Sequence, residues 1–151
     1  MVFYICFLKQ ETGREMEEQS RLMIKVEKWL EDNPLSRVLQ ERSHINSDAF
    51  KTMLIFYWSK GITFEKLANE LKIQRPGAWK RWQKGLDAVI RSFYTVELAI
   101  YAGILDAEIA ELLAQDLHDY AALARGEGDL EDLRDRIEER LVRLTKIAPK
   151  K

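Results

Sequence analysis

Cysteine and histidine are scarce in this chain, and their scarcity excludes several kinds of site. Cys6 is the only cysteine, and the two histidines, His44 and His118, are widely separated. A structural zinc site needs clustered ligands and a disulfide framework needs paired cysteines, so we expect neither. The sequence also has no glycine-rich phosphate loop, no Ser-His-Asp set and no HExxH motif. We therefore expect a protein that is not an enzyme and that holds no metal and no cofactor.

Long apolar runs are missing as well. The runs Val2–Leu8 and Met53–Trp58 are far shorter than the roughly 20 residues that cross a bilayer. Val2–Leu8 also lacks a basic leader and a small-residue cleavage site, which argues against a signal peptide. We expect no membrane association and a cytoplasmic location, which the low cysteine content also fits.

Neither charge sign dominates the composition. The 151 residues are 46% hydrophobic and carry a formal net charge of −1. The apolar content is ample for a core, whereas the near-zero charge gives no general attraction to polyanions. Any affinity for phosphates must therefore come from local clusters of Lys and Arg.

Apolar residues recur at helical spacing through most of the chain, which predicts an all-α fold. Residues 1–10 are the exception and are a candidate short strand or extended arm. Pro34 and Thr63 lie at favoured helix starts, and a bend in the longest helix is expected near Gly103 or Asp106. The expected helices cover residues 13–31, 34 onward, 47–60, 64–71, 75 to beyond 105, 109–124 and 130–144.

The predicted organisation has three parts. Residues 1–46 form an N-terminal helical segment, residues 47–105 form a core built around a helix-turn-helix, and residues 106–151 form an acidic helical pair. In the core, Ala68 is the small residue that two crossing helices need, and Ile73 is placed to fill the turn between them. One face of the second helix is apolar and is expected to pack on the protein; it comprises Ala78, Trp82, Leu86, Val89 and Phe93, with Trp79 and Ile90 at its flank.

The opposite face of this second helix is basic. Five cations and no carboxylate lie between Leu71 and Leu86, although acids slightly outnumber bases in the whole chain. A recognition helix points its N-terminal residues at base edges, so Gln74, Arg75 and Gly77 are expected deepest in the major groove. The lysines of this face and Arg91 are expected to contact phosphates. The predicted DNA-binding residues are Lys72, Gln74, Arg75, Gly77, Lys80, Arg81, Gln83, Lys84 and Arg91.

The segment FEKLANELKIQRPGAWKRWQKGL, residues 64–86, resembles the helix-turn-helix of sigma-factor region four and related bacterial and archaeal regulators. That group pairs a LAxxLxI first half with a basic second helix. The segment differs from it in having Lys72 where a turn glycine is common, and Gln74-Arg75-Pro76 where Ser or Thr usually opens the recognition helix. The resemblance implies sequence-directed binding of double-stranded DNA, most simply in transcriptional regulation.

The last third of the chain is acidic and carries a leucine seam. Twelve acids stand against three Arg between Asp106 and Glu139. Two-fold dimers of helix-turn-helix proteins present paired recognition helices, so we expect these C-terminal helices to form a homodimer. The alternative is that the last helix packs on its neighbour within one chain. The seam residues, at coiled-coil-like spacing, are Leu130, Leu133, Ile137, Leu141 and Leu144.

Two other functions fit the same pattern. One is a DNA-packaging role resembling that of the small subunits of viral terminases, which also join a helix-turn-helix to oligomerising helices. The other is a helical protein-interaction module without DNA binding, whose lysine-rich face is simply solvated. A ring-like oligomer would favour the first of these, and a dimer would favour a transcriptional regulator.

Overall fold

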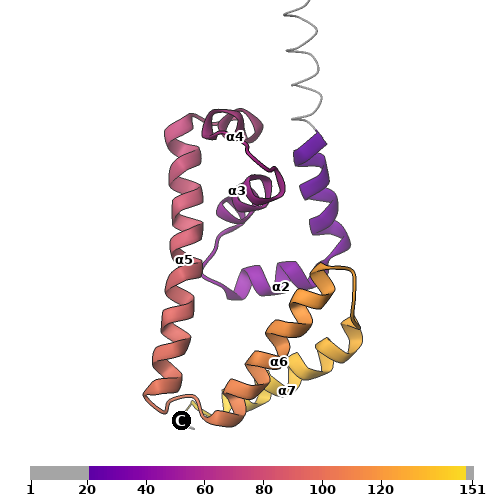
Figure 1. Cartoon of the computed structure of the whole chain (residues 1–151), viewed down its shortest axis with the longest axis vertical. Helices are drawn as coiled ribbons and strands as arrows, with labels where there is room; N and C mark the ends of the chain where they lie inside the picture. The colour runs from indigo at the N-terminus through magenta and orange to yellow at the C-terminus, as the bar shows by residue number, and fades with distance from the viewer. Residues whose placement is uncertain (1–20, 149–151) are drawn as a thin grey trace, which may run out of the picture. The chain divides into compact units, whose positions relative to one another are not determined.

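The computed structural model describes residues 21–148, and every secondary-structure element in this part of the chain is helical. The predicted strand or arm at residues 1–10, and the part of the first predicted helix before residue 21, lie outside the described residues. The all-α prediction is confirmed. Within the described part, no helix combines the length and apolar character that a membrane span requires. Residues 21–32 are helical, and the helices after them are α2 (Pro34–Arg42), α3 (Ser47–Trp58), α4 (Phe64–Leu71), α5 (Arg75–Tyr101), α6 (Ala107–Ala124) and α7 (Leu130–Thr145), as Figure 1 shows.

Local hydrogen bonds explain where several helices begin. The side chains of Asn46 and Thr63 each accept a hydrogen bond from a backbone N–H three residues further on, which caps α3 and α4. Helix α2 begins at Pro34, as predicted, because proline is tolerated in a first turn. The side-chain amide of Asn33 donates instead to the carbonyl oxygen of Trp29 (2.8 Å), and so ties α2 to the preceding helix.

The longest helix ends earlier than predicted. Helix α5 stops at Tyr101, and Gly103 follows with φ +75°. This left-handed conformation suits glycine and ends a helix. Asp106 then caps α6 by accepting the N–H of Ile109 (2.9 Å). The predicted bend near Gly103 or Asp106 is therefore a complete break between two helices.

The chain divides into two compact units between Arg91 and Ser92, inside α5. This division differs from the predicted one. The predicted N-terminal segment is not a separate unit, because Val26 shares a core with Ile55 and Leu67. Residues 92–105, which were predicted to belong to the core, group with the acidic helical pair instead.

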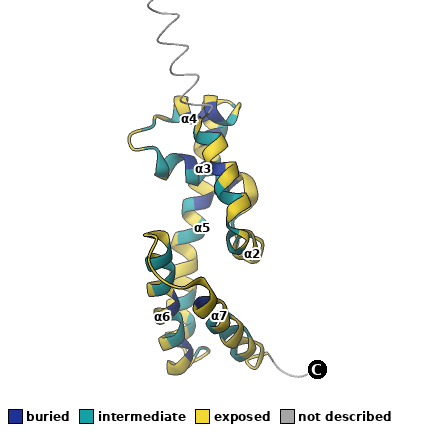
Figure 2. Cartoon of the chain, turned by 90° about the vertical axis from the view of Figure 1, so that its right-hand side faces the viewer, coloured by how far each residue is buried: buried dark blue, intermediate teal, exposed yellow. Residues whose placement is uncertain are grey.

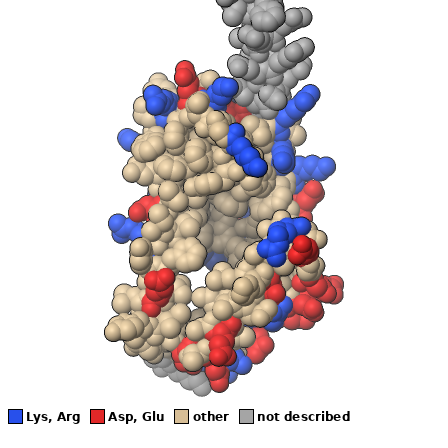
Figure 3. Space-filling view, viewed as in Figure 1, with Lys and Arg blue, Asp and Glu red and all other residues tan. Residues whose placement is uncertain are grey.

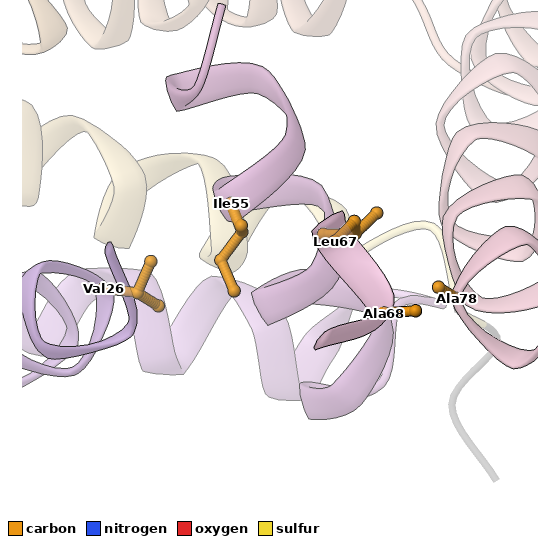
Figure 4. Close-up of a cluster of buried hydrophobic side chains, with 5 residues drawn as sticks. All are labelled: Val26, Ile55, Leu67, Ala68 and Ala78. Carbon is orange, nitrogen blue, oxygen red and sulfur yellow. The ribbon is translucent and has the colours of Figure 1, made fainter. Parts of the chain in front are cut away.

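The core of the first unit lies where α3 and α4 meet the helix over residues 21–32 and the start of α5. Figure 4 shows its five buried side chains, and Figure 2 shows buried positions along α3 and α4. Aromatic rings pack around them: the ring of Phe56 lies 5.4 Å from that of Phe64 and 5.3 Å from that of Trp82, centroid to centroid. The buried core residues are Val26, Ile55, Leu67, Ala68 and Ala78.

In the second unit, α7 packs on α6. Leu133 and Ile109 are buried, and Ile137 and Leu141 of the leucine seam are half-buried within one chain. Three arginines of α7 form ion pairs with acids of α6, which brings opposite charges together along the hairpin. The pairs are Arg140–Asp116 (2.9 Å), Arg143–Glu108 (2.9 Å) and Arg136–Asp119.

Candidate nucleic-acid interface

The turn between α4 and α5 is held by backbone hydrogen bonds and one half-buried side chain. Lys72 adopts a left-handed conformation (φ 55°, ψ 42°), which bends the chain out of α4. The N–H of Ile73 then donates to the carbonyl oxygen of Ala68 (3.0 Å), and Ile73 packs against the core. Sequence reasoning noted that Lys72 stands where a glycine is common, and the structure gives the reason: this is the position with positive φ.

Helix α5 begins at Arg75 with a first turn that holds no acidic residue. The carbonyl oxygen of Gln74 accepts the N–H groups of Gly77 (3.0 Å) and Ala78 (3.1 Å). Pro76 fits this first turn because its missing N–H has no partner to lose there. The positive end of the helix dipole therefore lies beside Gln74 and Arg75, which favours an anion at this end.

The inner side of α5 is fixed by small residues. Ala78 is fully buried beside Ala68, which lets α4 and α5 cross closely. Gly85 is also buried, and a Cβ there would lie 3.0 Å from Cγ of Met53 and closer still to its Sδ. Sequence reasoning missed this contact of α5 with the Met53 side chain of α3. The signal was present, because a glycine retained inside a helical pattern often has a packing reason.

Most of the predicted DNA-binding residues are exposed on one stretch of the chain. Figure 3 shows Lys and Arg side chains over the part of the molecule that holds α4 and the start of α5. The exposed residues of the predicted set in and after the turn form what we call the basic face: Lys72, Gln74, Arg75, Lys80, Gln83 and Lys84.

Three predicted residues are placed differently. Gly77 is half-buried over the turn, where a Cβ would lie 3.6 Å from Cδ1 of Ile73. Arg81 is half-buried, because it lies next to the inner side of the helix. Arg91 is exposed but forms an ion pair with Asp87 (2.9 Å), so part of its charge is neutralised within the helix. The basic face accordingly ends near Lys84.

The predicted apolar stripe of α5 packs inward only in the first half of the helix. Trp82 is half-buried and lies 5.3 Å from the ring of Phe64, centroid to centroid, whereas Trp79 is 44% exposed although its ring also contacts Phe64. Ile90 is 46% and Phe93 60% exposed. The prediction that Phe93 faces the protein is thus not met, because the first unit ends at Arg91.

A buried carboxylate links the helix-turn-helix to the helix over residues 21–32. Glu70 of α4 is buried, and its Oε1 accepts the backbone N–H of Met23 (3.2 Å), which links α4 to the helix over residues 21–32. Burial raises the pKa of Glu70, and the hydrogen bond from Met23 opposes part of that rise. Spacing alone could not identify this contact, since its two residues belong to different elements.

The chemistry available on the basic face is electrostatic and hydrogen-bonding. Lys and Arg side chains bind phosphates, and exposed Gln and Arg side chains at a helix start can donate to base edges. Within residues 21–148 no group of three or more Cys, His, Asp or Glu side chains is arranged to hold a metal ion. Comparisons with protein-family models, with curated proteins and with solved structures found no match to this chain.

Proposed function

We propose that this chain binds duplex DNA in a sequence-directed way through the basic face, most simply as a transcriptional regulator. The observation that carries the proposal is the combination of charge and geometry after α4. Two helices are joined by a short, well-bonded turn, and the second begins with exposed Gln74 and Arg75 at its positive end. No carboxylate lies between Leu71 and Leu86 to oppose phosphate binding.

Different residues of the face have different roles in this proposal. Lys72, Lys80 and Lys84 contact phosphates, which sets affinity and register without reading sequence. Gln74 and Arg75 enter the major groove, where Arg pairs with guanine and Gln with adenine. The half-buried Gly77 and Arg81 shape the helix start and its inner edge. Arg91 is a weaker phosphate ligand because Asp87 competes for it.

In this proposal the protein acts as a homodimer, and the two copies contact each other through the second unit. Two-fold symmetry presents two recognition helices to two half-sites, which multiplies both affinity and specificity. The acidic side chains of α6 and α7 do not bind phosphates, and four of them are already paired with arginines of α7. In the proposal, the second unit therefore holds the two copies together and the basic face contacts the DNA.

The test is a titration of labelled duplex at several salt concentrations. Removing one phosphate-binding cation lowers the salt dependence of log K by about one unit of slope, so Lys80→Ala with Lys84→Ala should lower it by about two for each bound chain and by about four for the dimer. Arg75→Ala should reduce the preference for the selected site by about 1–3 kcal/mol.

A matched control separates this face from general charge. Lys28, Arg37 and Arg42 are exposed cations on other elements of the first unit. Changing all three to Ala removes more positive charge than changing Lys80 and Lys84. The duplex affinity and its salt slope should nevertheless stay close to those of the parent protein. Binding that ignores salt, or that weakens equally in the control, contradicts the proposal.

A further inference from the structure

The C-terminal part of α5 and the turn after it carry a large exposed apolar surface. Tyr94 is 68% and Tyr101 92% exposed, and neighbouring large side chains are exposed by more than half. All of them belong to the second unit. We call this surface the α5 apolar face: Phe93, Tyr94, Leu98, Tyr101 and Ile104.

The α5 apolar face has the size of a protein interface. A fully accessible aromatic side chain offers about 150–250 Å², so the five side chains together present on the order of 600 Å². The largest apolar patch on a typical monomer is about 300–600 Å². A standard stable complex buries about 800 Å² on each partner, with aromatic residues enriched at its centre. The face therefore nearly suffices, with a few flanking residues, for a stable interface.

Part of the predicted leucine seam packs within one chain. Leu133 is buried, and Ile137 and Leu141 are half-buried where α7 packs on α6. Exposed apolar side chains on α6 and α7, such as Leu117 and Val142, lie on separate helices. Three of the five seam residues are thus used within one chain, whereas Leu130 and Leu144 are exposed.

The position of Glu97 indicates what covers the face. This exposed carboxylate lies within the face, three residues after Tyr94 and four before Tyr101. An arbitrary apolar partner would remove water from Glu97 and offer no hydrogen bond, which costs free energy. A second copy does offer one. When two copies of this helix pair antiparallel with the two-fold axis between residues 97 and 98, Tyr94 and Tyr101 of one copy lie about one helical turn from Glu97 of the other, where a tyrosine hydroxyl can reach the carboxylate. A phenol hydroxyl donates to a carboxylate, and such charge-assisted bonds are strong.

We infer that the α5 apolar face is the interface of a two-fold homodimer of this chain. This inference refines the association step of the proposed function by moving the contact from the leucine seam of α7 to α5. It does not depend on DNA binding, since it is tested by mass without DNA. A failure here therefore leaves the basic face untouched, and a failure of DNA binding leaves this interface untouched.

The experiment is sedimentation equilibrium of the full chain at micromolar concentrations. The parent protein should have the mass of two chains. Leu98→Glu with Tyr101→Glu should yield one chain with unchanged far-UV circular dichroism, because both side chains are exposed and the new charges crowd Glu97. The control, Leu117→Glu with Val142→Glu, adds the same charge to exposed positions of α6 and α7 and should remain a dimer.

A second pair of variants tests the partner chosen for Glu97. Tyr94→Phe with Tyr101→Phe keeps the rings and removes the hydroxyl donors, so the dimer should dissociate at least tenfold more readily. Unchanged dissociation would overturn the pairing of Glu97 with tyrosine. A monomeric parent would overturn the interface itself, as would a dimer that survives the glutamates on α5 but dissociates with Ile137→Asp and Leu141→Asp.

Discussion

Lys72 offers a way to separate the stability of the helix-turn-helix from its proposed DNA contact. It holds a left-handed backbone conformation (φ 55°). An L-residue pays about 1–2 kcal/mol there. Glycine avoids that strain, but its greater conformational freedom in the unfolded chain lowers the stability of the folded state by roughly 0.5–1 kcal/mol. Lys72→Gly should therefore raise the free energy of unfolding by roughly 0.5–1 kcal/mol. The same change removes one cation of the basic face from each chain, so the salt slope of duplex binding should fall by about one for each bound chain.

Lys84→Gly is the matched control, because it makes the same substitution in the interior of α5. Glycine in an exposed helix interior costs up to about 1 kcal/mol, so this variant should be less stable by roughly that amount. Its salt slope should also fall by about one for each bound chain. Urea unfolding and duplex titration measure the two effects separately. A loss of stability in Lys72→Gly would refute the assigned turn geometry, and an unchanged slope in both variants would refute the phosphate contacts.

Three further predictions concern packing and buried charge. Gly85→Ala should lower stability by about 1 kcal/mol, because the clash with Met53 outweighs the gain in helix propensity; in a Met53→Ala background the same change should be stabilising, which a double-mutant cycle in urea would check. Since burial raises the pKa of Glu70, the folded protein binds a proton at this carboxylate more readily than the unfolded chain, and stability should fall as pH rises through the raised pKa. Glu70→Gln should therefore be more stable than the parent at neutral pH but not in acid. An equal gain at both pH values would contradict this account. Arg140→Met alone leaves Asp116 buried and unpaired and should cost about 3–5 kcal/mol, whereas adding Asp116→Leu should recover most of that loss in thermal unfolding.

Much of the fold could be predicted because the signals are local. Thr63 caps α4 and Pro34 opens α2 through preferences that depend only on nearby backbone. Local signals do not tell which helices share a core. Val26 joins the core of α3 and α4, and nothing in its own segment distinguishes this from packing elsewhere. The boundary inside α5 was missed for the same reason, since helical periodicity continues unbroken across Arg91.

The candidate site was predictable where it depends on exposure along one helix. The wheel of α5 identifies Lys80 and Lys84 as outward residues, and both are exposed. The ion pair of Asp87 with Arg91 was predictable as well, because the two residues lie four apart on one helix, but sequence reasoning did not use this spacing. The wheel could not reveal Glu70 beneath the motif, whose hydrogen-bond partner lies on another helix.

The pattern along α5 itself supports two separate roles for this helix. At about 100° per residue, Lys80 lies about 200° round from buried Ala78, and Tyr94, Leu98 and Tyr101 lie roughly 140–200° round. The side of the helix turned away from the core is therefore basic at its start and apolar further on. A helix that meets only water stays polar on that side throughout. This change fits the two proposed interactions of α5, with a polyanion before Arg91 and with an apolar surface after it, and substitutions in either part should leave the other interaction intact.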